Sequence, residues 1–185
     1  ILDGLKPEQT LILDLKGDDE ENWLKRNQYG NFPWMWTTIT NFGGKTTSNG
    51  TLMRVYTETK RAEEKFGKDL LLKGTGIIPE GIENNAIVYQ WALDRSWQKN
   101  IPSIQENLEA FIVARYGTVH QDLKEGWQYL LQTIHSGYNP KITGGQGGYE
   151  SIFCGRPDSN YVRTTSCCGP TQIWYDVDVL TRAAI

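Results

Sequence analysis

Residues 70–81, LLLKGTGIIPEG, contain the pattern that best indicates the fold class of this chain. An apolar run that meets Pro79 and then Gly81 is typical of a buried strand, because proline and glycine end strand pairing. Glu80 therefore follows directly after the carboxyl end of this strand. The segment before it, residues 52–66, carries apolar side chains at helical spacing and predicts a helix. The sequence thus indicates a helix followed by a strand with a carboxylate at its end.

Further strands and helices surround this unit. Residues 10–15 predict a buried strand that ends near Asp14, and residues 32–40, rich in aromatic and β-branched side chains, predict a second strand. Because strands and helices alternate in this part of the chain, the order favours a parallel sheet. The remaining helices are predicted over residues 84–97, 102–116 and 122–136, with helix-like spacing again over 171–185.

These elements predict an α/β fold, the C-terminal portion of a (β/α)8 TIM-type barrel followed by the beginning of an all-helical domain. A closed barrel needs about 250 residues, whereas this chain has 185, so we expect it to be incomplete on its own. Because the chain starts at Ile1, we expect a processed or excised piece. We assign residues 1–138 to the barrel, 139–170 to an irregular connector rich in glycine and polar residues, and 171–185 to the helical domain.

Composition excludes several classes of function. Nineteen Lys and Arg stand against 22 Asp and Glu, so the formal net charge is -3, and nothing suggests a surface for nucleic acid. The mean hydropathy is -0.51, and no apolar run approaches the roughly 20 residues of a membrane span. His120 and His135 are isolated and are predicted to be surface or hydrogen-bonded structural residues, so we predict neither a metal nor a cofactor. The cysteines permit one disulfide among Cys154, Cys167 and Cys168.

Asp14, Asn41 and Glu80 are polar residues at predicted strand ends, where active sites of such barrels lie. Trp34 and Trp36 share one face of their strand, since side chains alternate with period two. Their rings suit either stacking on a sugar or packing in the core, and a glutamate after proline is equally typical of a solvated loop. From the residues alone these alternatives stay open.

Several short blocks resemble a known family in the same order and with compatible spacing. The blocks are Pro33-Trp34-Met35-Trp36, Asn41-Phe42-Gly43-Gly44, residues 74–82, residues 85–89, Ala114-Arg115-Tyr116-Gly117 and Ile173-Trp174-Tyr175. Together they cover most of the chain, from about Leu11 to the end, and resemble the lysosomal α-N-acetylglucosaminidase family, glycoside hydrolase family 89.

The resemblance implies a retaining glycosidase that removes terminal α-linked N-acetylglucosamine from heparan sulfate-type glycosaminoglycan or related glycans. It implies that Glu80 is the nucleophile and that the acid/base glutamate lies upstream, on the rest of the polypeptide or on a processed partner chain. The chain alone is therefore expected to be inactive. The expected sugar contacts are Asn41, by hydrogen bonds, and Trp36, by ring packing. After Gly44 the chain reads Lys45-Thr46-Thr47 where the family has an Asn-His pair, so this loop departs from the pattern.

The resemblance also implies a lysosomal or secreted protein. Asn49 lies in the sequon Asn49-Gly50-Thr51 and would carry a glycan on that route. The sequence does not decide whether the protein forms a homo-oligomer. The alternative interpretation is a non-catalytic carbohydrate-binding homologue or an inactive fragment.

Overall fold

The structure is a computed structural model that describes residues 2–17, 20–39, 52–79, 85–136 and 175–184. Its centre is a parallel three-stranded sheet in the order β1-β2-β3. The strands are β1 (Ile12–Asp14), β2 (Trp34–Thr38) and β3 (Leu72–Ile77). Each lies inside one of the runs predicted from the sequence, and the predicted parallel direction is confirmed. The predicted connector over 139–170 lies outside the described residues.

Helices follow the strands largely as predicted. They are α1 (Asn22–Lys25), α2 (Leu52–Phe66), α3 (Ala86–Asp94), α4 (Ile104–Tyr116), α5 (Gln121–Gln132) and α6 (Val177–Arg182). Short 3-10 segments span Leu2–Gly4, Pro7–Gln9, Asn27–Tyr29 and Gly67–Asp69. Only α1 has no counterpart among the predicted helices.

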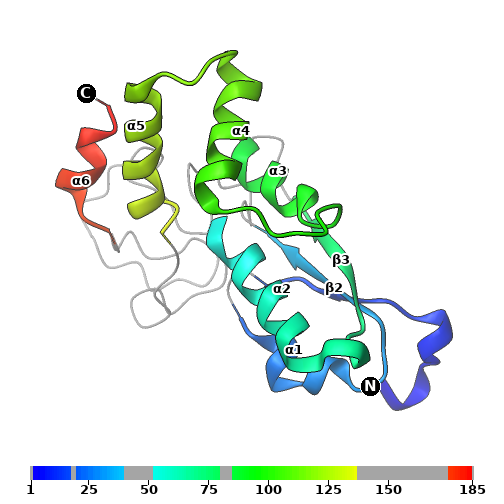
Figure 1. Ribbon diagram of the computed structural model, residues 1–185. Coiled ribbons are helices and arrows are strands. Elements are labelled where there is room, and N and C mark those ends of the chain that lie inside the picture. Colours follow the sequence, from blue (N-terminus) through cyan, green and yellow to red (C-terminus); the bar gives the residue numbers. More distant parts are fainter. Residues whose placement is uncertain (1, 18–19, 40–51, 80–84, 137–174, 185) are drawn as a thin grey trace, which may run out of the picture.

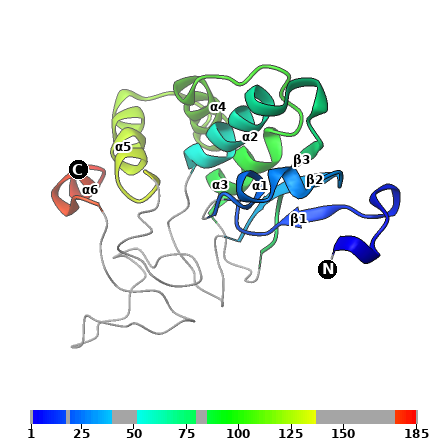
Figure 2. The same ribbon diagram turned by 90° about the horizontal axis from the view of Figure 1, so that it is seen from below.

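The helices lie at different distances from the sheet. Figure 1 shows α2 and α3 close to the strands, whereas α4, α5 and α6 follow one another away from the sheet. Figure 2, turned by 90°, shows the same succession, with α6 at the end remote from the first residues. One core nevertheless runs from the sheet into α4, because Leu108, Phe111 and Ile112 belong to the same hydrophobic cluster as Trp34 and Trp36 of β2.

Local sequence signals set the bounds of α4. The Ser103 side chain accepts a hydrogen bond from the Glu106 N–H at 3.2 Å, and Glu106 Oε2 accepts from the Ser103 N–H at 2.7 Å. This capping box satisfies two donors at the start of the helix. Gly117 adopts a left-handed conformation with φ 79° and ends the helix, as the sequence predicts.

Four tryptophans are among the most deeply buried side chains of the core: Trp23, Trp34, Trp36 and Trp91. Trp34 of β2 stacks on Trp23 of α1 with ring centroids 6.1 Å apart. Trp91 of α3 meets Tyr56 of α2 edge to face at 5.6 Å. Burial of a large apolar side chain contributes on the order of 1.5–3 kcal/mol. These rings therefore hold the helices against one face of the sheet.

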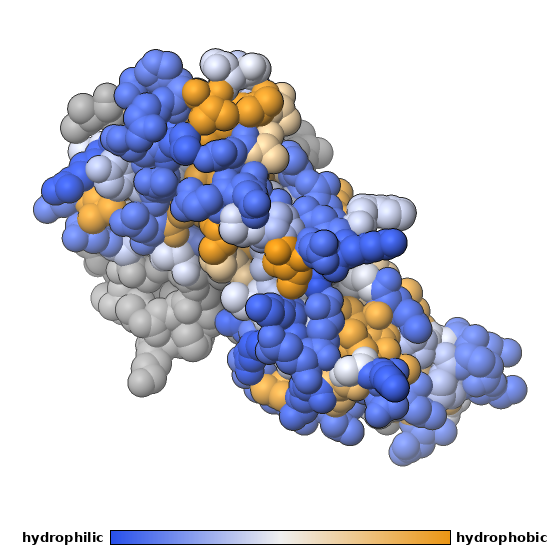
Figure 3. Space-filling view, in the orientation of Figure 1, coloured by the Kyte–Doolittle hydropathy of each residue, from blue (hydrophilic) through white to orange (hydrophobic). Residues whose placement is uncertain are grey.

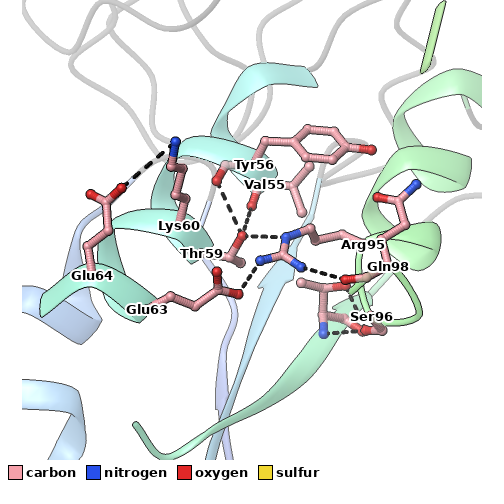
Figure 4. A network of polar contacts seen from close by, with 10 residues as sticks. Val55, Tyr56, Thr59, Lys60, Glu63, Glu64, Arg95, Ser96 and Gln98 are labelled. Carbon is pink, nitrogen blue, oxygen red and sulfur yellow. Dashed lines mark hydrogen bonds and ion pairs between the residues drawn. The ribbon is translucent and has the colours of Figure 1, made fainter. Parts of the chain in front are cut away.

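Arg95, immediately after α3, links α3 to α2 (Figure 4). Its side chain is 7% exposed, its Nε donates to Thr59 Oγ1 at 2.8 Å, and its guanidinium pairs with Glu63. Nη1 also donates to the Gln98 carbonyl at 3.3 Å. Because a buried charge is costly unless it is paired and hydrogen-bonded, these contacts fix the position of α3 relative to α2.

Apolar side chains are exposed on one side of the sheet and at the end of α4. Leu11, Leu13 and Leu15, in and beside β1, are 44–47% exposed. Within the described residues, β1 and β3 pair only with β2, so each has an unpaired edge. Figure 3 shows a largely polar face with an apolar patch over the end of α4. Val113, in the last turn of α4, is 47% exposed.

Candidate functional site at the carboxyl end of the sheet

The carboxyl ends of the three strands lie side by side because the strands are parallel. Thr38 of β2 pairs with Ile77 of β3. Beyond the strands, the Ile78 N–H donates to the Thr38 carbonyl at 3.0 Å, and the Gly17 N–H donates to the Thr37 carbonyl at 2.9 Å. In parallel α/β folds, binding and catalytic residues are found at this end of the strands. The three chain segments that leave the sheet therefore start from one candidate site.

The register brings the starts of two predicted site segments together. Glu80 is the third residue after Ile77, and Asn41 is the third after Thr38, which pairs with Ile77. The segments that carry the predicted nucleophile and the predicted hydrogen-bonding sugar contact thus leave the sheet from neighbouring positions. Glu80, Asn41 and Asn49 themselves lie outside the described residues, so their roles stay predictions.

Asp14 ends β1 as expected, but its side chain does not lie on an open rim. Asp14 is 3% exposed. In the sheet it lies opposite Trp36 of β2, which in turn lies opposite Thr75 of β3. The Thr75 hydroxyl donates to the Ala92 carbonyl in α3. Since paired residues of neighbouring strands point to the same face, Asp14 faces the helix-covered side of the sheet. The sequence prediction of Asp14 as a rim residue is therefore corrected to a buried position beneath that rim.

Burial sets the protonation behaviour of this carboxyl group. Desolvation raises the pKa of Asp14, and hydrogen bonds from the Tyr29 and Asn22 side chains partly oppose this rise. Burial and the contact with Asp14 also raise the pKa of the Tyr29 hydroxyl, so Tyr29 remains a donor. Asp14 Oδ2 is buried and has no hydrogen-bond partner. The carboxyl is thus a polar anchor for the segment that contains Asn22 and Tyr29.

A run of left-handed residues brings Tyr29 to Asp14. Asn27, Gln28 and Tyr29 have φ values of 44°, 45° and 63°, a conformation that costs energy in residues other than glycine. Hydrogen bonds compensate: Gln28 Nε2 donates to the Asp69 carbonyl at 2.8 Å, and its Oε1 accepts from the Leu71 N–H at 2.9 Å. The same run therefore fixes the entry of the chain into β3. The sequence analysis missed it, although asparagine is a residue that tolerates positive φ.

Trp36 and Trp34 share one face of β2, as period two predicts, and both lie in the core. Trp34 is 0% and Trp36 1% exposed. A Cβ atom placed on Gly17 would lie 2.5 Å from Trp36 Nε1, so the indole packs directly against the chain that leaves β1. Contact between Trp36 and a sugar stays a prediction, and it would require that the residues covering this ring move.

The sequence predicts that each histidine is either a surface residue or a hydrogen-bonded structural residue, and the structure contains one of each kind. His120 is exposed, and its Nδ1 accepts a hydrogen bond from the Asp122 N–H at 3.4 Å at the start of α5. His135 is 1% exposed, and its Nε2 lies 3.4 Å from Asn85 Nδ2. Asn85 is the first described residue after the segment that contains Glu80. No sequence pattern predicts this contact, because the two residues are 50 positions apart.

The described part of the chain contains neither a metal-binding cluster nor a membrane-spanning helix. No group of three or more His, Cys, Asp or Glu side chains there could hold a metal ion. Among the same residues, no helix has the length and the apolar character that crossing a bilayer requires.

Two family models together match most of the chain. The model of the α-N-acetylglucosaminidase TIM-barrel domain matches residues 1–99, and that of the α-N-acetylglucosaminidase C-terminal domain matches residues 108–185. The chain is 27% identical over 177 residues to the α-N-acetylglucosaminidase of Homo sapiens, a match that covers 95% of this chain and 22% of the relative.

Solved structures of a family 89 glycoside hydrolase from Clostridium perfringens are also similar. The complex with 2-acetamido-1,2-dideoxynojirmycin aligns at a TM-score of 0.79 and 27% identity, over 98% of this chain and 20% of that one. A variant with two glutamate-to-glutamine substitutions, in complex with its substrate GlcNAc-α-1,4-galactose, aligns at 0.77 and 26% identity, over 96% and 19% of the two chains. The present chain thus spans about a fifth of the length of these relatives.

Proposed function

Since the chain belongs to the α-N-acetylglucosaminidase family, glycoside hydrolase family 89, we propose that it is part of a glycosidase that removes terminal α-linked N-acetylglucosamine. The match of the TIM-barrel family model over residues 1–99, which include Glu80 and Asn41, carries this proposal. Because the chain spans about a fifth of its relatives, the activity is assigned to the complete polypeptide. In the same proposal, residues 1–138 belong to a TIM-type barrel, 139–170 to a connector and 171–185 to an all-helical domain.

Glu80 is the proposed nucleophile of a retaining mechanism. Such a mechanism uses two carboxyl groups about 5–5.5 Å apart. The Glu80 carboxylate attacks the anomeric carbon while a second carboxyl group protonates the leaving oxygen, and that group then takes a proton from the water that hydrolyses the glycosyl-enzyme. The second group belongs to the rest of the polypeptide or to a processed partner chain, so the present chain alone is inactive.

The proposed substrate is a glycan that ends in α-linked N-acetylglucosamine, of the heparan sulfate type or a related glycan. Two observations support this class: the relative from Homo sapiens is an α-N-acetylglucosaminidase, and the Clostridium perfringens enzyme was solved with GlcNAc-α-1,4-galactose. In this proposal Asn41 hydrogen-bonds the sugar and Trp36 contributes ring packing.

We place the protein on a lysosomal or secreted route, in line with its family. On that route Asn49 carries a glycan, and one pair among Cys154, Cys167 and Cys168 is oxidised. Peptide mass mapping of the native protein measures both features directly, and an unmodified Asn49 together with three free thiols would contradict this location.

The Glu80→Gln variant of the complete polypeptide tests the proposed mechanism. We expect turnover of an aryl α-N-acetylglucosaminide to fall at least about a thousandfold, because the amide cannot form the covalent intermediate. Circular dichroism and the melting temperature should stay unchanged. Azide added to the Glu80→Ala variant should restore cleavage and give the β-glycosyl azide.

Glu64→Gln is the matched control, because Glu64 is an exposed residue of α2 that pairs only with Lys60 in the described structure. It should retain wild-type activity. Substantial activity in Glu80→Gln would refute the assignment of the nucleophile. A complete polypeptide that binds the glycan but neither hydrolyses it nor reacts with a mechanism-based inhibitor would instead be the carbohydrate-binding homologue.

A further inference from the structure

Asp14 places a carboxyl group in the core at the end of β1. The side chain is 3% exposed, and its Oδ2 atom is buried without a hydrogen-bond partner. Trp36, which lies opposite Asp14 in the sheet, is 1% exposed and belongs to the hydrophobic core. An ionised carboxylate shares its charge between two oxygens, so burying one of them without a donor costs free energy. This position therefore disfavours the charged form of the side chain.

Desolvation is the largest effect on the protonation of this group. It raises the pKa of Asp14 above its ordinary value, because burial disfavours the charged form. Hydrogen bonds from the Tyr29 and Asn22 side chains act in the opposite direction. The backbone N–H groups of Trp23 and Lys16 also lower the pKa, but the pKa remains raised. The direction of the pKa and the unpartnered Oδ2 atom thus agree that the neutral carboxyl group fits this position better.

The charged groups around Asp14 do not neutralise it. Among the described residues, the titratable and charged side chains around the carboxyl group and its tyrosine partner are Lys16, Glu20, Arg26 and Tyr29. Lys16 pairs with Glu20 at 3.4 Å, and Arg26 and Glu20 shift the pKa of Tyr29 in opposite directions. β2, which lies beside Asp14 in the sheet, contains no charged residue. Within the described part of the chain, no cation forms an ion pair with Asp14.

Three of the donors to Asp14 belong to one segment, from α1 to the left-handed run, and this segment also contacts the other two strands. Trp23 of α1 stacks on Trp34 of β2 with ring centroids 6.1 Å apart. Gln28, in the left-handed run, accepts a hydrogen bond from the Leu71 N–H at 2.9 Å, directly before β3. Asp14 therefore connects the end of β1 to a segment that holds β2 and the start of β3.

We propose that Asp14 is a pH-dependent anchor of this segment: the protonated side chain stabilises the fold, and its ionisation at higher pH weakens the fold. The sign follows from the raised pKa of Asp14 in the folded protein. Below about pH 4, the ordinary pKa of an aspartate, the stabilisation is fully present. It is lost as the pH rises through the higher pKa of the folded state. This inference goes beyond the proposed function and does not rest on it, because its test measures unfolding and not hydrolysis.

Asp14→Asn in the complete polypeptide imitates the protonated side chain. The amide keeps an oxygen that accepts from Tyr29, and it carries no charge at any pH. Melting temperatures of variant and wild type are measured between pH 4 and pH 7.5. We expect the difference, variant minus wild type, to rise by about 2 °C or more over this range. Asp3→Asn, which changes an exposed aspartate, is the matched control and should differ from the wild type by the same amount at both pH values.

Tyr29→Phe gives a second, independent measurement. It removes a donor that favours the charged carboxylate, so its melting temperature relative to the wild type should be lower at pH 7.5 than at pH 4. Combined with Asp14→Asn, it should add no pH dependence, because no carboxyl group remains to titrate. A difference for Asp14→Asn that stays constant or falls as the pH rises would overturn the inference. If Asp14→Asn does not fold, Tyr29→Phe decides, and an equal effect at both pH values overturns the inference.

Discussion

At the scale of single residues, the tightest constraint at the carboxyl end of the sheet is the contact between Gly17 and Trp36. A Cβ on Gly17 would lie 2.5–2.8 Å from three atoms of the indole, which is closer than packed atoms come. The ring is 1% exposed and belongs to the core, so it cannot move aside without disturbing its neighbours. Gly17 is therefore required by the close approach of the chain to this ring.

Gly17→Ala tests this constraint. We expect it to destabilise the complete polypeptide by about 1–3 kcal/mol, the usual cost of overpacking a dense core, which a lower melting temperature would report. Gly4→Ala is the matched control, because a Cβ there meets no atom within 4 Å. Equal melting temperatures for the two variants would mean that the chain after β1 moves away from the indole at little cost.

The sequence predicted where Asp14 lies along the chain but not where its side chain points. A strand as short as Ile12–Asp14 gives too few alternating positions to tell the helix-covered face from the opposite face. The hydrogen bond that Tyr29 makes to Asp14 depends on the left-handed run of Asn27, Gln28 and Tyr29. Such a run follows from tertiary contacts, and no propensity predicts it.

At the scale of elements, periodicity predicted what is stabilised locally. The predicted and observed bounds of α2 agree, since an amphipathic pattern starts at Leu52 and ends before Gly67. The helix predicted over 122–136 ends instead at Gln132. The Thr133 hydroxyl donates to the Tyr129 carbonyl at 2.7 Å and the chain turns there, so a side-chain contact overrides the continuing helical pattern.

Contacts between elements could not be predicted from the sequence. Arg95 bonds Thr59 across 36 positions, and His135 contacts Asn85 across 50. Helical spacing identifies the face on which such a residue lies but not its partner on another helix. Glu80 and Asn41 were predicted in another way, from the resemblance to a family. A sequence motif can indicate the role of a residue even when none of its contacts is known.

At the scale of the whole molecule, the sheet has unpaired edges and an apolar side without cover in the described structure. β1 and β3 each pair only with β2 there. Leu11, Leu13 and Leu15 are 46%, 47% and 44% exposed. Unpaired strand edges beside apolar side chains promote association between chains. In a closed barrel, the side of the sheet that faces away from the helices is filled with side chains. In the TIM-type barrel that we propose, the rest of the complete polypeptide would therefore cover Leu13.

Leu13→Lys should therefore have opposite effects in the two contexts. The 185-residue chain alone is expected to aggregate on refolding, and the lysine should raise its soluble fraction in light scattering, because a charge opposes association of the sheet. In the complete polypeptide the same lysine should lower the melting temperature, since burying an unpaired charge costs several kcal/mol. Leu5→Lys is the control, because Leu5 is 45% exposed but lies outside the sheet. A soluble 185-residue monomer that unfolds cooperatively, or a complete polypeptide that tolerates Leu13→Lys as well as Leu5→Lys, would show that this side of the sheet needs no cover.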